Sequence, residues 1–202
     1  MKRSETARQQ VVDYVRQEIC RHGVSKLTMD DIARGMRVSK RTLYQLFPQK
    51  TCLIRLCLSD IANEARGSLP DREDRSAAAS VQTLFQTLNC YIRLLHTLGS
   101  TLLTDLLPDE EYHSFIEWEL GFWKQQLLDA FNQCQAHNCL LPFVETVTIV
   151  ENLTRILFEQ CRQGVVSYTE QRMLSNVLLR GFFRQEEISY IDAYLASKQR
   201  PV

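Results

Sequence analysis

The sequence predicts an all-α protein in which a small N-terminal helix-turn-helix domain is joined to a larger helical domain. Long segments repeat apolar residues at intervals of three and four, which is the spacing of one face of an α-helix. Helix-breaking residues are scarce, with seven glycines and five prolines among 202 residues. The polar, proline-containing stretch at 68–76, SLPDREDRS, indicates a loop or linker. We therefore predict a first domain over residues 1–50, a connecting helix over about 50–67 and a second domain over 68–202.

The first domain contains two short helical patterns separated by a turn. Thr28 and Asp31 form a capping-box-like pair, so a helix is expected to begin at Thr28. Its apolar positions follow at helical spacing: Met29, Ile32, Ala33 and Met36. After the turn, Ser39 is placed to cap a second helix. The inward positions of that helix are Leu43, Leu46 and Phe47.

The outward face of the second helix is rich in hydrogen-bonding side chains. Hydroxyl and cationic groups near a helix N-terminus suit phosphate contact, and Lys, Arg and Gln carry the donors and acceptors that read base edges in a major groove. A short basic helix alone is more often an ordinary solvated helix. The capped helix and short turn before it favour DNA recognition instead. The face consists of Ser39, Lys40, Arg41, Thr42, Tyr44 and Gln45.

Residues 8–58 resemble the DNA-binding domain of transcriptional regulators of the tetracycline-repressor (TetR) family. The motif that carries the resemblance consists of Thr28, Ile32, Ala33, Val38, Ser39, Thr42, Leu43, Tyr44, Phe47 and Lys50. It implies an all-helical homodimer that binds a double-stranded DNA operator with its N-terminal domain and a small-molecule effector with its C-terminal domain. It also implies that the helix over about 50–67 transmits effector binding by changing the separation of the two DNA-binding domains.

The resemblance assigns DNA contacts by position. Thr28 and Lys50 would hold phosphates at two helix starts, Tyr44 would contact the DNA backbone, and the other residues of the outward face would read bases. Arg37 stands where the family often has a turn glycine; a left-handed backbone there costs about 1 kcal/mol, and we expect Arg37 to contact phosphate. Arg41 adds a long donor at a position that is often small, and Gln49 replaces a better helix cap.

Charge is unevenly distributed along a chain whose net charge is zero. Residues 1–50 hold eleven Lys and Arg against five Asp and Glu, so the remainder carries the compensating acidic excess. This arrangement favours nucleic-acid contact through the N-terminal domain. The start of the chain lacks the apolar core of a signal peptide, no apolar run approaches about 18 residues, and the seven cysteines are scattered. We expect a cytoplasmic protein with reduced thiols and no membrane contact.

Periodicity places the other helices. A brace helix is expected over 5–22, ending at Gly23. The second domain is expected to contain helices over 77–106 with a bend or an end at Gly99, about 108–136, about 142–162 and about 169–184. The segment after 184 either extends the last helix or forms a short separate one. The resemblance implies that the pair over 142–184 forms the homodimer interface.

An aromatic-rich region of the second domain has two interpretations. It forms the core, or it lines a pocket for an effector between helices. The candidate pocket residues are Phe85, Tyr91, His96, His113, Trp118, Phe122, Trp123 and Gln126. Glu117 is a further polar candidate.

Other chemistries have weaker support. Cys134 and Cys139 flank His137, but no second spaced pair accompanies them, so we predict no metal site; a thiol switch and simple burial both stay open. No catalytic motif is present, so we predict no enzyme activity and no cofactor. The leading interpretation is a homodimeric repressor released by an effector. A thiol-responsive regulator, an activator, and a helical carrier or enzyme are the alternatives.

Overall fold

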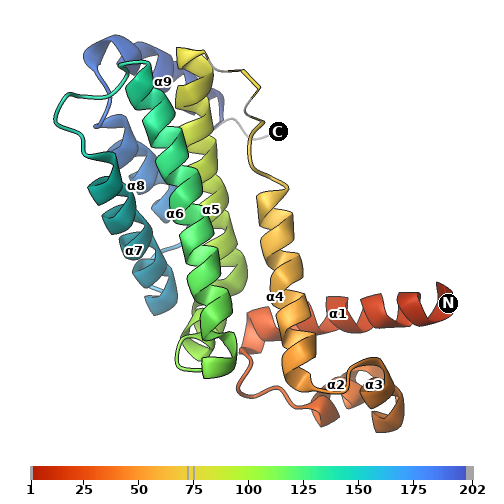
Figure 1. Cartoon of the computed structure of the whole chain (residues 1–202). Coiled ribbons are helices and arrows are strands. Elements are labelled where there is room, and N and C mark those ends of the chain that lie inside the picture. Colours follow the sequence, from red (N-terminus) through yellow and green to blue (C-terminus); the bar gives the residue numbers. More distant parts are fainter. Residues whose placement is uncertain (1, 72, 75, 199–202) are drawn as a thin grey trace. The chain divides into compact units, whose positions relative to one another are not determined.

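The computed structural model describes residues 2–71, 73–74 and 76–198, which form nine α-helices (Figure 1). The predicted all-α class is confirmed. The chain divides into two compact units. The first consists of Met1–Gly67, Leu94–Glu119 and Cys161–Gly164, and the second of Ser68–Arg93, Leu120–Gln160 and Val165–Val202.

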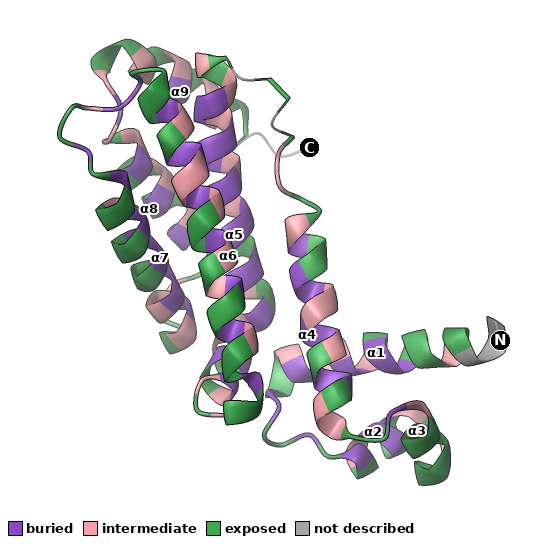
Figure 2. Cartoon of the chain, in the orientation of Figure 1, coloured by how far each residue is buried: buried purple, intermediate pink, exposed green. Residues whose placement is uncertain are grey.

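The first unit begins with four helices: α1 (Lys2–His22), α2 (Met29–Met36), α3 (Lys40–Leu46) and α4 (Lys50–Arg66). α1 packs against α4, and each buries an aliphatic face (Figure 2). The Arg16 guanidinium also donates two hydrogen bonds, of 2.7 and 2.6 Å, to the Glu64 carboxylate. The buried positions are Val11, Val12, Val15 and Ile19 on α1 and Leu53, Ile54, Cys57, Leu58 and Ile61 on α4.

Two long helices contribute residues to both units. These are α5 (Ala77–Leu106) and α6 (Glu110–Ala136). The bend predicted at Gly99 is present, because this residue has a left-handed φ of 74° within α5. Glycine tolerates that conformation without the steric penalty of a Cβ atom.

The second unit is completed by α7 (Thr146–Gln163), most of which it contains, α8 (Tyr168–Arg180) and α9 (Gln185–Ser197). Its interior is aromatic. The rings of Phe85 and Phe183 stack with centroids 5.9 Å apart, and those of Tyr91 and Trp123 are also 5.9 Å apart. All four side chains are buried.

The last helices differ from the expected boundaries. α7 begins at Thr146 rather than near residue 142, and α8 ends at Arg180 rather than near 184. The chain is extended after α8 because the Leu141 amide donates to Phe182 O and the Arg184 amide donates to Cys139 O, both at 2.9 Å. These long-range bonds take the place of further helical turns. The following segment therefore forms the separate helix α9, the second of the two expected alternatives.

The cysteines are free thiols, and five of the seven are buried. Burial raises the pKa of Cys57 to about 12 and of Cys139 and Cys161 to about 11, and it also raises the pKa of Cys134. Thiols with such values are poor nucleophiles near neutral pH. Within the described ranges, no cluster of three or more His, Cys, Asp and Glu side chains is placed to hold a metal ion. No helix of those ranges is long and apolar enough to cross a bilayer.

Candidate DNA-binding interface

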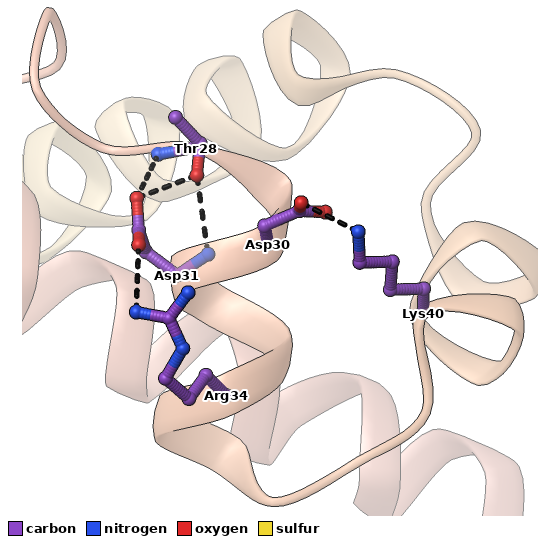
Figure 3. A network of polar contacts seen from close by, with 5 residues as sticks. All are labelled: Thr28, Asp30, Asp31, Arg34 and Lys40. Atoms are coloured by element: carbon purple, nitrogen blue, oxygen red, sulfur yellow. Dashed lines mark hydrogen bonds and ion pairs between the residues drawn. The ribbon is translucent and has the colours of Figure 1, made fainter.

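The start of α2 is fixed by a reciprocal capping box. The Asp31 amide donates to Thr28 Oγ1 at 3.1 Å, and the Thr28 amide and hydroxyl donate to Asp31 Oδ2 at 3.2 and 2.5 Å (Figure 3). These hydrogen bonds favour the carboxylate form, so they lower the pKa of Asp31. The predicted helix start is confirmed. The Thr28 hydroxyl is thereby occupied within the protein.

The turn between α2 and α3 places Arg37 in the left-handed region, with φ 55° and ψ 37°. The Arg37 amide donates to Arg34 O at 3.1 Å, and the Val38 amide donates to Ala33 O at 3.0 Å. This pair of bonds satisfies carbonyl groups at the end of α2. Arg37 therefore occupies the conformation that the sequence analysis associated with glycine at this turn.

α3 is held at both ends and along its inner face. Ser39 Oγ accepts a hydrogen bond of 3.1 Å from the Thr42 amide, so the predicted cap is present. Leu43 is fully buried and Phe47 is 1 % exposed. These contacts fix which side of α3 faces the solvent.

The outer face of α3 is exposed as a continuous polar surface, which we call the reading face. Tyr44 is 47 % exposed although it is aromatic. The face offers two cations, a hydroxyl, a phenol and an amide, a combination that suits contact with phosphates and base edges. Its members are Lys40, Arg41, Thr42, Tyr44 and Gln45. Ser39 and Arg37 are exposed just before it.

Two predicted DNA-contacting cations have partners within the protein. Lys40 Nζ lies 2.5 Å from Asp30 Oδ2, which joins α3 to α2 (Figure 3). Lys50 Nζ donates to Val24 O at 2.7 Å. Sequence reasoning missed both contacts because residues 10 and 26 positions apart give no periodic signal. It also left open the role of Arg8, whose guanidinium lies 4.7 Å from the centroid of the Phe47 ring.

The segment from α1 to α4 is also hydrogen-bonded to the parts of α5 and α6 that belong to the same unit. The Ser25 amide donates to Asp105 Oδ2 at 2.9 Å, which fixes the loop between α1 and α2. Arg55 donates to the Glu111 carbonyl, and the Thr51 hydroxyl donates to the Glu111 carboxylate. These bonds join the start of α6 to the first half of α4. Nothing in the local sequence indicated these contacts.

The sequence of this region also matches a known protein family. Residues 15–57, from the second half of α1 to the middle of α4, match the family model for bacterial regulatory proteins of the tetR family. Residues 15–57 therefore form a helix-turn-helix segment of the tetR type. The match covers the capping box, the left-handed turn and the reading face, so it supports the N-terminal helix-turn-helix that the sequence predicted. No curated protein sequence matches the chain.

Solved structures resemble the chain over nearly its whole length. A TetR-family regulator from Marinobacter aquaeolei VT8 has a TM-score of 0.76 and 16 % identity, covering 96 % of this chain and 98 % of that one. CprB from S. coelicolor A3(2) has a TM-score of 0.73 and 17 % identity, covering 97 % and 100 %. A candidate transcriptional regulator from Saccharomonospora viridis, in complex with choline, has a TM-score of 0.72 and 14 % identity, covering 90 % and 100 %. At these identities the comparison establishes the fold.

The eight candidate effector residues are divided between the two units. Tyr91 and Trp123 lie together in the core of the second unit, where the Tyr91 hydroxyl donates to Thr154 O at 3.2 Å. Phe122 contacts Trp123 edge-on, with ring centroids 5.6 Å apart, and Phe85 contacts Phe183. Gln126 is half-buried in the same unit.

The other three candidates belong to the first unit. Trp118 is 56 % exposed and lies under the Arg66 guanidinium, and the exposed His113 pairs with Glu117 at 3.2 Å. His96 is half-buried. Four of the aromatic candidates, Phe85, Tyr91, Phe122 and Trp123, pack against other rings of the second unit.

Proposed function

We propose that this regulator is a homodimeric repressor whose two α3 helices enter successive major grooves of a near-palindromic operator. The observation that carries the proposal is the reading face, a polar surface on a helix whose orientation is fixed by Ser39, Leu43 and Phe47. In helix-turn-helix dimers the two reading helices lie about 34–36 Å apart. Arg41 and Gln45 are our candidates for base readout, and Tyr44, Thr42 and Arg37 for backbone contact.

Thr28, Lys40 and Lys50 are also proposed to contact DNA, although each already has a hydrogen-bond partner within the protein. Their polar groups are engaged by Asp31, Asp30 and Val24 O respectively. An ammonium group has three donors, so Lys40 and Lys50 can each bind a phosphate while keeping or exchanging the internal bond. Thr28 has its main role in the capping box, with its backbone at the positive end of α2.

The proposed dimer interface is the apolar outer surface of α7 and α8. Six large apolar side chains are exposed there, including Val177 at 64 % and Val147 at 55 %. A contiguous apolar surface of this kind is typical of an association site. A second copy of the same two helices complements it in a four-helix arrangement. The exposed members are Val147, Ile156, Met173, Leu174, Val177 and Leu178.

We further propose that an effector in the second unit lowers operator affinity. A hundredfold release requires only about 2.7 kcal/mol of differential binding, which is within the ordinary range of allosteric coupling. The bonds from Thr51 and Arg55 to Glu111 offer a route, because they join α4 to a helix that continues into the second unit.

The deciding experiment is selection of bound sequences from a random DNA pool by the purified full chain, at moderate salt, followed by sizing of the complex. Enrichment of a near-palindromic motif bound by two chains supports the proposal. A folded protein that enriches no motif, or one bound by a single chain, contradicts it. A variant with Arg41→Ala and Tyr44→Phe serves as the matched control, because both side chains are exposed and their loss leaves the core unchanged.

A further inference from the structure

An open cleft of about 450 Å³ lies within the second unit. One wall is a single face of α5, where Gln86, Asn89, Cys90 and Arg93 recur at helical spacing. The opposing walls come from the beginning of α8 and the end of α9, and Ser68 closes one side. The volume falls in the range of small-molecule sites. Tyr168 and Arg172 line it from α8, Tyr194 lines it from α9, and Lys198 lines it directly after α9.

The lining of this cleft is cationic. Arg93 lies on α5, Arg172 lies on α8 and Lys198 directly follows α9, and no Asp or Glu is among the lining residues. The chain beyond residue 50 carries an excess of acidic residues. A cleft there that is lined by three cations and no acid therefore differs from the composition of the surrounding chain. A concave surface lined by one sign of charge attracts ligands of the opposite sign. The positive charge of the lining therefore favours an anionic ligand.

Two of the cations are paired with aromatic rings. The Arg172 guanidinium lies 5.8 Å from the Tyr168 ring centroid, and Lys198 Nζ lies 5.7 Å from that of Tyr194. Burial raises the pKa of the Tyr194 phenol, so it stays protonated and able to donate a hydrogen bond. Tyrosine rings also provide flat apolar surface next to these donors. The cleft thus offers cations, phenols and ring faces together.

Asn89 provides a further observation that points to a ligand. Its Oδ1 atom is buried and has no hydrogen-bond partner among the described residues. A buried acceptor without a partner is costly, and a hydroxyl or amino donor elsewhere on the ligand would remove that cost, since the anionic group itself has only acceptors. The unsatisfied group lies on the same α5 face as Arg93.

We propose that this cleft binds a small organic anion, one that carries a carboxylate or phosphate group on a flat apolar ring, and that this anion is the effector. Arg93, Arg172 and Lys198 bind the anionic group, and Tyr168 and Tyr194 contact the ring. The regulatory half of the proposal rests on the proposed function, whereas the binding half does not. α5 also carries Asp105, which holds the loop before α2, and Ser68 lies two residues after the end of α4.

The binding test uses four benzene derivatives of similar size: benzoate, phenyl phosphate, benzamide and benzylamine. Ligand-observed saturation-transfer NMR and thermal shift are measured on the full chain. We expect benzoate and phenyl phosphate to bind with dissociation constants on the order of 1 mM, as fragments of this size do. Benzamide and benzylamine are expected to bind at least about tenfold more weakly. Equal binding of benzamide and benzoate overturns the proposal.

Substitutions then locate the site. Arg172→Gln and Lys198→Gln each remove one cation from the rim, and each is expected to weaken benzoate binding about tenfold. Lys124→Gln, an exposed residue of α6 outside the cleft, is the matched control and is expected to change nothing. Circular dichroism verifies that all three variants are folded. Benzoate binding that is unchanged in both cleft variants overturns the assignment.

The regulatory half is tested with the operator obtained by DNA selection. Benzoate or phenyl phosphate at saturation is expected to weaken operator binding by the wild type at least about fivefold, and to have no such effect on Arg172→Gln. Anion binding that leaves operator affinity unchanged overturns the effector role while the site stands. Failure to select any operator contradicts the proposed function. The result of the anion-binding test stands in that case, because it does not depend on an operator.

Discussion

Lys40 Nζ lies 2.5 Å from Asp30 Oδ2, so the first residue of α3 is tied to the second residue of α2 across the turn (Figure 3). Both side chains are largely exposed, at 65 % and 49 %. An exposed pair of this kind contributes little to stability. The pair is instead expected to affect DNA binding. It engages Lys40 of the reading face and places the Asp30 carboxylate at the edge of that face.

Asp30→Asn is expected to raise operator affinity. The substitution removes a negative charge beside the DNA phosphates and frees Lys40, which together correspond to about 1 kcal/mol or about fivefold in affinity. The measurement is a fluorescence-anisotropy titration at several salt concentrations, with Asp129→Asn in the second unit as the charge-matched control. A loss of affinity in Asp30→Asn contradicts this account of the pair.

Arg41→Ala is expected to weaken operator binding by about 1–3 kcal/mol and to relax selection at one or two base positions, because the proposed bidentate contact to a base would be lost. Thermal stability should stay within about 0.5 kcal/mol of the wild type, since Arg41 is exposed. Repeating the DNA selection with the variant measures both effects. If affinity falls equally for all sequences, Arg41 contacts phosphate rather than a base.

Val177→Asp is expected to give a folded monomer with little operator affinity. Val177 is 64 % exposed in the single chain, so the charge disturbs no core, but it would be buried without a partner in the proposed interface. Sedimentation velocity reports the mass, and circular dichroism reports the fold. Gln125→Asp, an exposed position on α6, is the control. A Val177→Asp dimer as stable as the wild type would place the interface elsewhere.

Glu64→Gln tests the connection between α1 and α4. The two hydrogen bonds from Arg16 lower the pKa of Glu64 below its ordinary value of 4.5. The stabilisation is therefore fully present above pH 4.5 and is lost as the pH falls through the lowered value. We expect the wild type to be more stable than the variant at pH 7, and the difference to shrink below pH 4.5. Urea unfolding at several pH values measures it, and a constant difference would contradict it.

Thiol reactivity separates a redox sensor from a ligand-responsive regulator. Cys52 is exposed, whereas Cys139 and Cys161 are buried and have pKa values of about 11. About 0.1 % of each buried thiol is therefore thiolate at pH 8. We expect Cys52 to react quickly with a colorimetric disulfide reagent, Cys20 and the buried thiols slowly, and all seven once unfolded. Rapid modification of Cys134 or Cys139 in the folded protein would restore the thiol-switch alternative.

The local features of the DNA-binding domain were predictable because each depends on neighbours in the chain. The capping box needs only Thr28 and Asp31, and the cap of α3 needs only Ser39 and the Thr42 amide. The buried faces follow from periodicity, as for Leu43 and Phe47. The left-handed turn at Arg37 agrees with the glycine that the resembled family often has at this position.

The contacts that decide how the site works were not predictable, because they join residues distant in sequence. Asp105 holds Ser25 across 80 positions, and the bonds that end α8 early come from the segment between α6 and α7. The division of the effector candidates has the same origin. Periodicity identified Phe85, Tyr91 and Trp123 as inward-facing, but inward positions fill a core as readily as they line a pocket.

The sequence by itself therefore determined the helices, their caps and the chemistry of the reading face, since those depend on spacings within about four residues. Only the tertiary structure decided the partners of Lys40 and Lys50, and only it brought Arg93, Arg172 and Lys198 around one cleft. These three cations are spread over more than a hundred positions of the chain. Their proximity results from the packing of α5, α8 and α9, which no local pattern encodes.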